Sequence, residues 1–384
     1  MPTAAQAKPP RCAILPPVPV PYREPLFALL AERGRLAIEV LYQAGQGAGW
    51  DQRGDWFPDS HPYPARALRA WQWARAGRSP IAVPRGLGGE LRRFGPACVV
   101  SWEFGPTTLR ALASCRARRR ALVVFSELTP HSEPELSPGR LRLHRFLARR
   151  VDGFVVASSA GRRRLEAMGV EAGRVEVALQ SADVARFQDA GSARNGRDAD
   201  GPLRVLAVGR LVPDKNLGAL IEAFAGAGLE PGEAELELCG SGPLEAELRA
   251  LAARLGVAVR FRGYAPPGEL PALYARAGAL ALVSSYEPFG VTAREAAAAG
   301  LPLICSRTAG AAGDVAVEGE NALLVDPGDR SEIGAALRRL VREPQLRARL
   351  AQGSRAVTER RPLEADAEAF ERAVLGAISR AARE

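Results

Sequence analysis

The chain has 384 residues, a length that suits two domains of about 150–200 residues each better than one hydrophobic core. Its 47% hydrophobic and 25% charged residues are ordinary for a water-soluble protein, and no apolar stretch approaches the roughly 20 residues of a transmembrane helix. The composition therefore argues against a membrane span. The first residues contain no apolar run long enough for a signal peptide, which predicts a cytoplasmic protein. The net charge is +9.

Short apolar runs of strand length alternate with longer segments that suit helices, a pattern typical of βα units and parallel sheets. Six strands are predicted in the first half, at 12–16, 36–42, 97–102, 121–125, 153–157 and 175–179. The second half repeats the scheme, with strands at 203–208, 234–239, 257–261, 279–283, 301–305 and 322–325. We therefore predict an α/β fold of two Rossmann-like, doubly wound domains.

The segment 189–202, DAGSARNGRDADGP, separates the two halves. It has little apolar content and several turn formers, which indicates a flexible linker. We predict an N-terminal domain over 1–188, a second domain over 203–362 and a C-terminal helix over 363–384 that packs back on the first domain. Two domains hinged in this way would leave a cleft between them.

The positive charge belongs to the first half. Residues 1–183 hold 27 Lys and Arg against 16 Asp and Glu, a balance of +11, whereas the remainder holds 25 against 27, a balance of −2. The densest basic segments are RARRR at 116–120, RLRLHRFLARR at 140–150 and RRR at 162–164. They favour an anionic lipid surface or an acidic acceptor, and the alternative is a solvated, arginine-rich helix surface. Since no aromatic interleaving or known binding module accompanies them, we expect no nucleic-acid partner.

The five cysteines are odd in number and show no CxxC spacing. Several lie inside apolar, strand-like runs, where thiols usually pack as small hydrophobic groups. We therefore expect neither a metal site nor disulfides from them.

The run GRLVPDKN follows the strand predicted at 203–208 and places Arg210 and Lys215 five positions apart. Ligands of open α/β sheets bind outside the carboxyl ends of strands. Arg offers planar, bidentate donors and Lys a mobile point charge, a pair suited to a diphosphate. Lys215 is one of only two lysines among 52 basic residues. A lysine in a chain that otherwise uses arginine indicates that this position requires lysine. The alternative is that Asp214 pairs locally with Lys215 at a solvated helix start.

A second motif, EPFGVTARE, begins in the loop after the strand predicted at 279–283. Glu287 and Glu295 are separated by seven residues. This spacing puts the Glu287 carboxylate in the loop and the Glu295 carboxylate one to two turns into the following helix. One carboxylate can hold ribose hydroxyls and the other hexose hydroxyls. The start of a helix also exposes N–H groups that suit phosphate. These N–H groups belong to Gly290, Val291 and Thr292. The alternatives are a turn acid for Glu287 and an exposed helix residue for Glu295.

Six segments occur in a fixed order: GRLVPDKN, LCGSGPLEAEL, RFRGYAP, EPFGVTARE, AGLPLICSRTAG and ENALLVDPGD. Over about residues 203–330 they resemble the signature of the GT-B fold retaining glycosyltransferases of family 4. The resemblance implies two Rossmann-like domains facing a central cleft, a nucleotide-diphosphate sugar donor, retention of configuration, no cofactor and no essential metal. The only Asp-x-Asp, at 198–200, lies in the predicted linker, in agreement with a metal-independent enzyme.

The resemblance also implies roles for individual residues. Arg210 and Lys215 hold the donor diphosphate. Glu287 is a catalytic residue that contacts the sugar hydroxyls, Glu295 binds the ribose, and Tyr264 lies beside the base. The remaining donor-binding positions are Gly209, Phe289, Gly290, Val291 and Thr292.

Gly240 and Gly242 begin a GxG pattern after the strand predicted at 234–239. Glu245 stands where a dinucleotide-binding fingerprint has its third glycine, and no acid ends the next strand. The pattern therefore does not predict a nicotinamide oxidoreductase.

The first half departs further from the family. PYREPLF at 21–27 resembles a subgroup with a Pro-Tyr-Arg-x-x-Leu-Phe pattern, which implies that Tyr22 and Arg23 face the cleft. Where many members end a central strand with His-Asp, this chain reads VVFSELTPHSE. Glu127 is therefore our candidate for a catalytic carboxylate that stabilises positive charge at the anomeric carbon or orients the acceptor. The alternative is a helix-start acid before Pro130.

The role of Glu103 in SWEFG and that of His131 stay open between catalysis and structure. His61 and His144 are assigned to the surface or to packing, because the sequence shows no partner for them.

These residues indicate a retaining hexosyltransferase that acts on a hydroxyl acceptor, which is a glycan, a lipid-linked saccharide or a small molecule. The basic first half adds peripheral contact with an anionic membrane. Three alternatives remain, in this order: a sugar-nucleotide epimerase or hydrolase of the same fold, a nucleotide-sugar-binding protein with weak catalysis, and a nucleic-acid or membrane-surface protein, which only the basic first half suggests.

Overall fold

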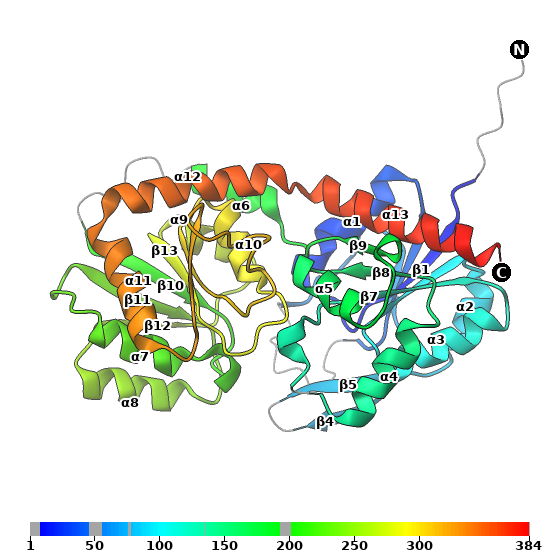
Figure 1. Cartoon of the computed structure of the whole chain (residues 1–384), viewed down its shortest axis with the longest axis horizontal. Coiled ribbons are helices and arrows are strands. Elements are labelled where there is room, and N and C mark those ends of the chain that lie inside the picture. Colours follow the sequence, from blue (N-terminus) through cyan, green and yellow to red (C-terminus); the bar gives the residue numbers. More distant parts are fainter. Residues whose placement is uncertain (1–7, 46–55, 76–77, 135, 193–200, 384) are drawn as a thin grey trace, which may run out of the picture. The chain divides into compact units, whose positions relative to one another are not determined.

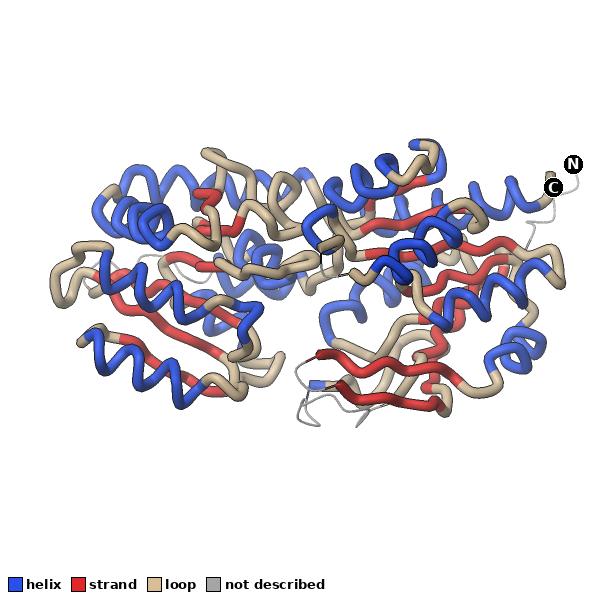
Figure 2. Tube along the Cα trace, turned by 60° about the horizontal axis from the view of Figure 1, so that its bottom comes forward, coloured by secondary structure: helices blue, strands red, loops and turns tan. Residues whose placement is uncertain are grey.

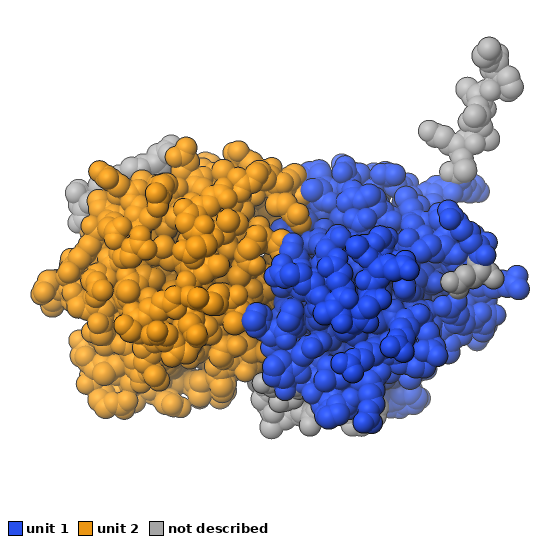
Figure 3. Space-filling model, in the orientation of Figure 1, with its two compact units in different colours: residues 1–181, 363–384 blue, residues 182–362 orange. Residues whose placement is uncertain are grey.

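The computed structural model describes residues 8–45, 56–75, 78–134, 136–192 and 201–383. It divides into two compact units, residues 1–181 with 363–384 and residues 182–362, which Figure 3 shows in two colours. Each unit is an α/β structure built on one all-parallel sheet with helices on both faces (Figures 1 and 2). The predicted fold class of two Rossmann-like domains is therefore confirmed.

The sheet of the first unit has seven strands in the order β3-β2-β1-β6-β7-β8-β9. They are β1 (Arg11–Leu15), β2 (Ala37–Tyr42), β3 (Ala65–Ala67), β6 (Cys98–Trp102), β7 (Ala121–Ser126), β8 (Gly153–Val156) and β9 (Val175–Val177). The six predicted strands are all present, with ends displaced by at most two residues. Their apolar runs are continuous because helices cover both faces of a parallel sheet.

An antiparallel hairpin and the short strand β3 were not predicted. The hairpin consists of β4 (Ala70–Arg75) and β5 (Arg78–Pro84) and lies outside the main sheet. The helices of the first unit are α1 (Glu24–Arg33), α2 (Leu87–Phe94), α3 (Pro106–Arg116), α4 (Pro138–Ala148), α5 (Ser159–Ala167) and α13 (Leu363–Ala381).

The sheet of the second unit has six strands in the order β12-β11-β10-β13-β14-β15, the strand order of dinucleotide-binding Rossmann domains. They are β10 (Leu203–Val208), β11 (Ala234–Cys239), β12 (Val259–Gly263), β13 (Ala279–Leu282), β14 (Leu303–Ser306) and β15 (Ala322–Val325), and all six were predicted to within two residues. The helices are α6 (Val184–Ser192), α7 (Leu217–Gly226), α8 (Glu245–Leu255), α9 (Leu270–Ala275), α10 (Val291–Ala298), α11 (Arg330–Arg342) and α12 (Pro344–Arg360).

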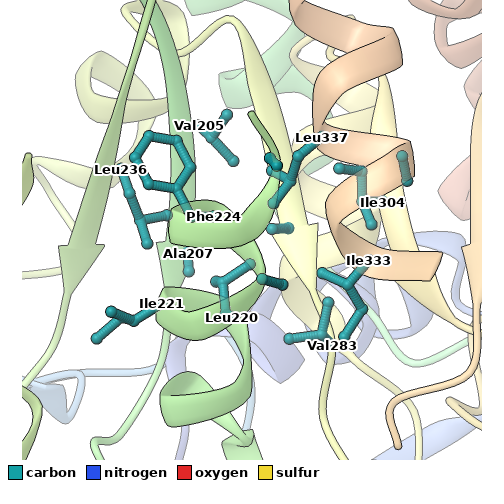
Figure 4. Packing of buried hydrophobic residues seen from close by; sticks show 14 of the residues in the cluster. Val205, Ala207, Leu220, Ile221, Phe224, Leu236, Val283, Ile304, Ile333 and Leu337 are labelled. Atoms are coloured by element: carbon teal, nitrogen blue, oxygen red, sulfur yellow. The ribbon is translucent and has the colours of Figure 1, made fainter. Parts of the chain in front are cut away.

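The core of the second unit lies between this sheet and helices α7 and α11. Leu220 and Phe224 of α7 and Leu337 of α11 point onto the strands, where they meet buried side chains such as Val205 and Ile304 (Figure 4). Close-packed aliphatic side chains of this kind fix the strand ends, because the interior tolerates little displacement. The loops that leave β10 and β13 therefore start from rigid positions.

Helix α13 belongs to the first unit although it ends the chain. It packs against α1, β7, β8 and β9 (Figure 1). Asp366 Oδ1 accepts a hydrogen bond from the Leu179 N–H at 2.8 Å, and the buried Glu371 carboxylate contacts Arg33 and Arg35 at 3.0 and 3.2 Å.

The boundary between the units differs from the expected position at residue 188. Helix α6, at Val184–Ser192, packs against α9 and α10 and therefore groups with the second unit. The packing is close: a Cβ on Gly191 of α6 would lie 2.5 Å from the Ala299 carbonyl oxygen. Of the expected linker 189–202, residues 193–200 lie outside the described residues.

Candidate active site

The order of the second sheet reverses between β10 and β13, which are hydrogen-bonded neighbours. In open α/β sheets, the carboxyl ends of the two strands at such a point border the ligand crevice. GRLVPDKN follows the end of β10, and SSYEPFG follows β13. The topology therefore brings the two motifs of the sequence to one place.

Lys215 and Glu287 are in direct contact. Lys215 Nζ lies 2.5 Å from Glu287 Oε2, and the Ser284 hydroxyl donates to the same oxygen at 3.0 Å. The two loops are also joined through their backbones, since the Ser285 N–H donates to the Asp214 carbonyl at 3.0 Å. The partner of Lys215 is thus Glu287, and not the local Asp214 of the alternative interpretation.

Arg210 adds a second cation at the same strand end. Its side chain is exposed and forms no hydrogen bond or ion pair with any residue in the described part of the chain. It follows Gly209, whose φ of 154° lies in a region that residues other than glycine rarely adopt. Since Glu287 pairs with Lys215, Arg210 is the cation of this strand exit whose side chain stays available to a ligand.

Helix α10 starts beside this pair with N–H groups that have no acceptor in the described residues. Gly290 is the N-cap, with φ of 100°, and the first turn provides the N–H groups of Val291 and Thr292. Unpaired N–H groups and the helix dipole make such a start attractive to phosphate.

The side chain of Phe289 does not face solvent, because it is only 2% exposed. It anchors the loop, while the Phe289 carbonyl accepts from the Ala311 N–H at 2.8 Å and the Glu287 carbonyl from the Gly310 N–H at 3.0 Å. A Cβ on Gly310 would lie 1.9 Å from the Pro288 carbonyl oxygen, so only glycine allows this approach. The loop of SRTAG therefore supports the loop that carries Glu287.

Glu295 has its own partner. Glu295 as a whole is 8% exposed, and its Oε2 accepts from the Tyr274 hydroxyl of α9 at 2.6 Å. Burial raises the pKa of the Glu295 carboxyl to about 7, the Tyr274 hydrogen bond lowers it, and the charge of Asp183 raises it further. Near neutral pH this carboxyl therefore exists in both protonation states.

Tyr264 follows β12, which is two strands away from β10 in the sheet. Between them, the glycines of the GSG pattern fit closely against the neighbouring loop. A Cβ on Gly240 would meet the Gly209 carbonyl oxygen at 1.8 Å, and one on Gly242 would meet the Leu211 carbonyl oxygen at 2.4 Å. The packing of two strand exits explains these glycines without a dinucleotide.

The first unit has a polar cluster at the carboxyl ends of β6 and β7. Glu127 Oε1 accepts hydrogen bonds from Arg23 Nη2 at 2.9 Å, from Trp102 Nε1 at 3.2 Å and from Gln180 Nε2 at 2.9 Å. The Arg23 guanidinium is buried, 4.7 Å from the centroid of the Trp102 ring and 5.3 Å from that of Tyr22. The structure thus brings together Tyr22, Arg23 and Glu127, which the sequence analysis had singled out separately.

The histidines differ in their surroundings. His131 is exposed. His144 is buried against Arg164 and the Phe104 ring, and burial lowers its pKa to about 4, so packing accounts for it. His61 packs against the Tyr42 and Tyr63 rings, in agreement with its assignment to surface or packing, and its Nδ1 also lies 2.7 Å from Glu24 Oε2. The sequence could not show this pair, since its members are 37 residues apart.

Some groups are absent from the described ranges. They contain no set of three or more His, Cys, Asp or Glu side chains arranged to hold a metal ion. None of their helices has the length and apolar character that a bilayer crossing requires. All five cysteines are free and buried, which confirms that they pack as small hydrophobic residues.

Residues 192–357 match the family model described as Glycosyl transferases group 1. This segment is therefore similar to that family. The glycogen synthase of Mycobacterium tuberculosis is 33% identical over 213 residues, 55% of this chain and 50% of that protein. The D-inositol 3-phosphate glycosyltransferase of Corynebacterium efficiens is 36% identical over 193 residues, 47% of this chain and 45% of that protein. The chain thus spans about half the length of the curated relatives it matches.

Solved structures show the same fold over nearly the whole chain. The Anabaena protein HepE, crystallised with UDP and glucose, superposes with a TM-score of 0.72 at 20% identity, covering 94% of this chain and 98% of HepE. The fold of both units is therefore GT-B, as the resemblance implied. The family match agrees with the site, since the matched segment contains Arg210, Lys215, Glu287 and Glu295.

The sequence analysis missed several residues of the group 1 segment and of the first unit. Asn216 donates to the Val283 and Pro327 carbonyls at 3.1 and 2.7 Å and so joins the ends of β13 and β15. Tyr274, Trp102 and Gln180 also contact predicted site residues. Only Asn216 left a signal in the sequence, because it directly follows Lys215 in a motif already singled out. In the structure it has a left-handed φ of 55°, a conformation that Asn tolerates.

Proposed function

We propose that this chain is a retaining, metal-independent glycosyltransferase that moves a hexose-type sugar from a nucleotide-diphosphate sugar to a hydroxyl acceptor. The observation that carries the proposal is the contact between Lys215 and Glu287 beside the unpaired N–H groups of α10. Cations and helix N–H groups suit a leaving diphosphate, and a carboxylate suits sugar hydroxyls. The group 1 relatives support the reaction class through their names, glycogen synthase and D-inositol 3-phosphate glycosyltransferase.

In this proposal the second unit binds the donor. Arg210, Lys215 and the start of α10 at Gly290 hold the diphosphate and neutralise the charge that develops as it leaves. Glu287 orients the sugar hydroxyls, and Glu295 accepts hydrogen bonds from the ribose. The remaining donor positions are Gly209, Tyr264, Val291, Thr292 and the backbone of Phe289.

The chemical step combines positioning with charge neutralisation. The acceptor hydroxyl attacks the anomeric carbon on the face from which the phosphate leaves, the sugar–phosphate bond breaks, and the diphosphate takes the hydroxyl proton. Attack on that face retains the configuration. Glu127 of the first unit stabilises positive charge at the anomeric carbon or orients the acceptor. Its Oε1 is held by three donors, so its direction is fixed before substrate binds.

The first experiment is calorimetric titration with UDP, GDP and ADP and with their glucose conjugates. UDP comes first because HepE, which shares the fold, was crystallised with it. We expect micromolar binding of one nucleotide, and a loss of at least tenfold in Glu295→Ala and in Lys215→Ala. Arg254→Ala is the matched control, because Arg254 is an exposed cation of α8 in the same unit.

The outcomes separate the alternatives. Binding with turnover that requires a hydroxyl acceptor supports the transferase. Turnover of the sugar nucleotide without any acceptor identifies an epimerase or hydrolase instead. Binding without turnover identifies a nucleotide-sugar-binding protein. If no nucleotide binds, the proposal is wrong.

A surface of the first unit supports peripheral contact with an anionic membrane. Helix α4 carries exposed Arg142, Arg145 and Phe146, and the exposed Arg149 is its C-cap. Residues 136–151 contain no acid. Phe146 is 40% exposed, and the Arg150 guanidinium lies 3.9 Å from its ring centroid. Cations flanking an exposed aromatic ring are typical of helices that lie at a lipid interface. We include this α4 surface in the proposal as the place where a lipid-linked acceptor is approached.

Sedimentation with vesicles tests the α4 surface. We expect binding to phosphatidylcholine vesicles that contain phosphatidylglycerol, at low salt only, and loss of binding in the double variant Arg142→Glu, Arg145→Glu. Arg349→Glu is the control, because Arg349 is an exposed arginine of α12 in the second unit. Absence of binding to anionic vesicles at low salt would remove membrane contact from the proposal.

A further inference from the structure

The two carboxylate oxygens of Glu127 differ in their hydrogen bonds. Its Oε1 accepts from three donors, on Arg23, Trp102 and Gln180, whereas Oε2 has no partner in the described residues. A carboxylate held in this way has one direction in which it can meet a substrate. The direction depends on the backbone from which the side chain starts, at the end of β7.

Glu103 holds that backbone. Its Oε1 accepts from the Glu127 N–H at 2.6 Å, and its Oε2 accepts from the Ser126 hydroxyl at 2.8 Å. The Glu103 N–H in turn donates to the Phe125 carbonyl at 2.8 Å. Three hydrogen bonds from one residue thus join the end of β6 to the last residues of β7.

The Glu103 backbone itself has an unusual conformation. Its φ of 56° is in the left-handed region, which residues with a side chain seldom adopt. The Thr108 hydroxyl donates to the Glu103 carbonyl at 2.5 Å and so keeps the turn in place. Such a conformation persists only where the surroundings determine it, and it occurs preferentially at functional sites.

We propose that Glu103 is a positioning residue for Glu127, whose carboxylate fixes the Ser126–Glu127 backbone so that Glu127 Oε2 is presented to the substrate. This inference rests on the proposed function, in which Glu127 acts on the sugar or the acceptor. Glu103 does not itself meet the substrate.

Protonation of Glu103 weakens this arrangement. Burial raises the pKa of the Glu103 carboxyl to about 7, and the charge of Glu127 adds to this effect. The Glu127 N–H, the Ser126 hydroxyl and the charge of Arg164 act in the opposite direction. Above pH 7 the ionised carboxylate accepts both hydrogen bonds, and a hydrogen bond to an ionised acceptor is roughly twice as strong as one to a neutral acceptor.

The charged neighbours on the surrounding elements are few. Two charged side chains act on Glu103: Glu127, directly after β7, and Arg164 of α5. Arg164 in turn contacts Glu133, at 3.2 Å, and His144 of α4, at 3.0 Å. His144 is neutral near pH 7, because burial lowers its pKa to about 4. The Glu103 carboxyl, with its pKa of about 7, therefore changes charge near neutral pH while His144 does not.

Nuclear magnetic resonance of the Glu127 amide tests the inference in the full-length protein. We expect its proton to resonate far downfield above pH 7 and to move upfield on acidification, with a midpoint near 7. Glu103→Gln abolishes this titration, and Glu103→Asp, which keeps the charge, retains part of it. Glu171→Gln, at an exposed acid of the same unit, leaves it unchanged.

Turnover is measured in parallel with UDP-, GDP- and ADP-glucose, using the conjugate that reacts. Glu103→Gln is expected to lower kcat about tenfold with the donor KM unchanged, because small misplacements of a reacting group are costly. It should also remove the acidic limb near pH 7 from the profile of kcat, measured at saturating donor so that the ionisation of Glu295 does not contribute through donor affinity. Glu103→Asp recovers part of the rate.

Two results would overturn the inference, and they are distinguishable. If the Glu127 amide does not titrate and Glu103→Gln keeps full kcat while Glu127→Gln loses it, positioning by Glu103 is wrong and the proposed function stands. If Glu127→Gln itself keeps full kcat, the proposed role of Glu127 is wrong, and the inference is wrong with it.

Discussion

Glu295 is the residue of the donor site whose charge depends most on its surroundings. Burial raises its pKa to about 7, so below that pH the folded protein holds it largely as a neutral acid. A neutral carboxyl accepts hydrogen bonds from ribose hydroxyls more weakly than a carboxylate does. We expect the nucleotide Kd to fall about tenfold between pH 6 and pH 8, because one ionisation centred near 7 is nearly complete over that range.

The pH dependence needs a control, because a bound phosphate group also titrates near pH 6. Glu295→Gln removes the carboxyl and keeps the phosphate, so calorimetry on this variant isolates the ligand contribution. Tyr274→Phe removes a hydrogen bond that favours the ionised form, and the midpoint should therefore move to higher pH. Equal slopes in wild type and Glu295→Gln would show that Glu295 does not titrate in this range.

Lys215 provides a second prediction at the residue scale. Its Nζ contacts Glu287 Oε2 at 2.5 Å, and its chain runs close to Gly209, where a Cβ would lie 3.3 Å from Lys215 Cε. Lys215→Ala should weaken nucleotide-diphosphate binding by about 10- to 100-fold, the worth of a hydrogen bond to a charged group. Lys215→Arg should not restore affinity, because the planar guanidinium is wider than the methylene chain that passes Gly209.

The measurement is calorimetry on both variants, beside Arg254→Ala. Wild-type affinity in Lys215→Arg would mean that any cation suffices at this position. The low number of lysines in the chain would then carry no functional information.

Which site residues the sequence could predict depends on where their partners lie. Arg210, Lys215, Glu287 and Glu295 were predicted because short motifs fix their spacing relative to strand ends and a helix start. Tyr274 was missed because its contact with Glu295 joins two helices 21 residues apart. Gln180 reaches Glu127 from 53 residues away, a contact that no local pattern records.

At the scale of elements, the strands were predictable and the hairpin was not. A strand covered on both faces appears as a continuous apolar run, and the twelve predicted runs all became parallel strands. In strand β4, AWQWAR, Gln72 and Arg75 interrupt the apolar residues, and Trp71 is 50% exposed. Such a hairpin outside the main sheet lacks the apolar run on which the prediction relied.

The loop that follows β14 gives a prediction about how elements support the site. Gly310 lies against the loop that carries Glu287, where a Cβ would meet the Pro288 carbonyl oxygen at 1.9 Å. Gly310→Ala must displace backbone, which costs about 1–3 kcal/mol of unfolding free energy. Displacement of that loop also separates Glu287 from Lys215, so nucleotide affinity should fall.

Gly226→Ala is the matched control for this prediction. Gly226 ends α7 in the same unit, is exposed and has open space where a Cβ would be. Urea unfolding should show a change within about 0.5 kcal/mol for this variant. If Gly310→Ala unfolds and binds nucleotide like Gly226→Ala, the support of the Glu287 loop by Gly310 is refuted.

At the scale of the whole molecule, the chain returns to its first unit after completing the second. The sequence predicts a helix at the C-terminal end, but the groups that receive α13 lie far upstream. Arg33 and Arg35 are more than 330 residues before Glu371, and Leu179 is 187 residues before Asp366. No pattern within α13 identifies these partners, so only the structure could name them.

Glu371 is the clearest test of this return. Its side chain is 1% exposed and contacts Arg33 and Arg35, and the Arg33 side chain keeps 22% exposure. Glu371→Ala leaves two arginines without their carboxylate and should lower the unfolding free energy of the first unit by about 2–3 kcal/mol. This is below the cost of breaking a fully buried pair, because the arginines can turn to solvent. Glu368→Ala, at a half-exposed acid of the same helix that also contacts Arg33, should cost less than about 1 kcal/mol.

Tryptophan fluorescence can assign the loss to one unit, because all five tryptophans lie within residues 1–181. In urea, Glu371→Ala should move the fluorescence midpoint to lower denaturant and leave nucleotide binding by the second unit intact at low urea. Equal midpoints in Glu371→Ala and Glu368→Ala would show that the buried carboxylate does not hold α13 on the first unit. The apolar face of α13, with Phe370, Val374 and Ala377 buried, would then be sufficient for its attachment.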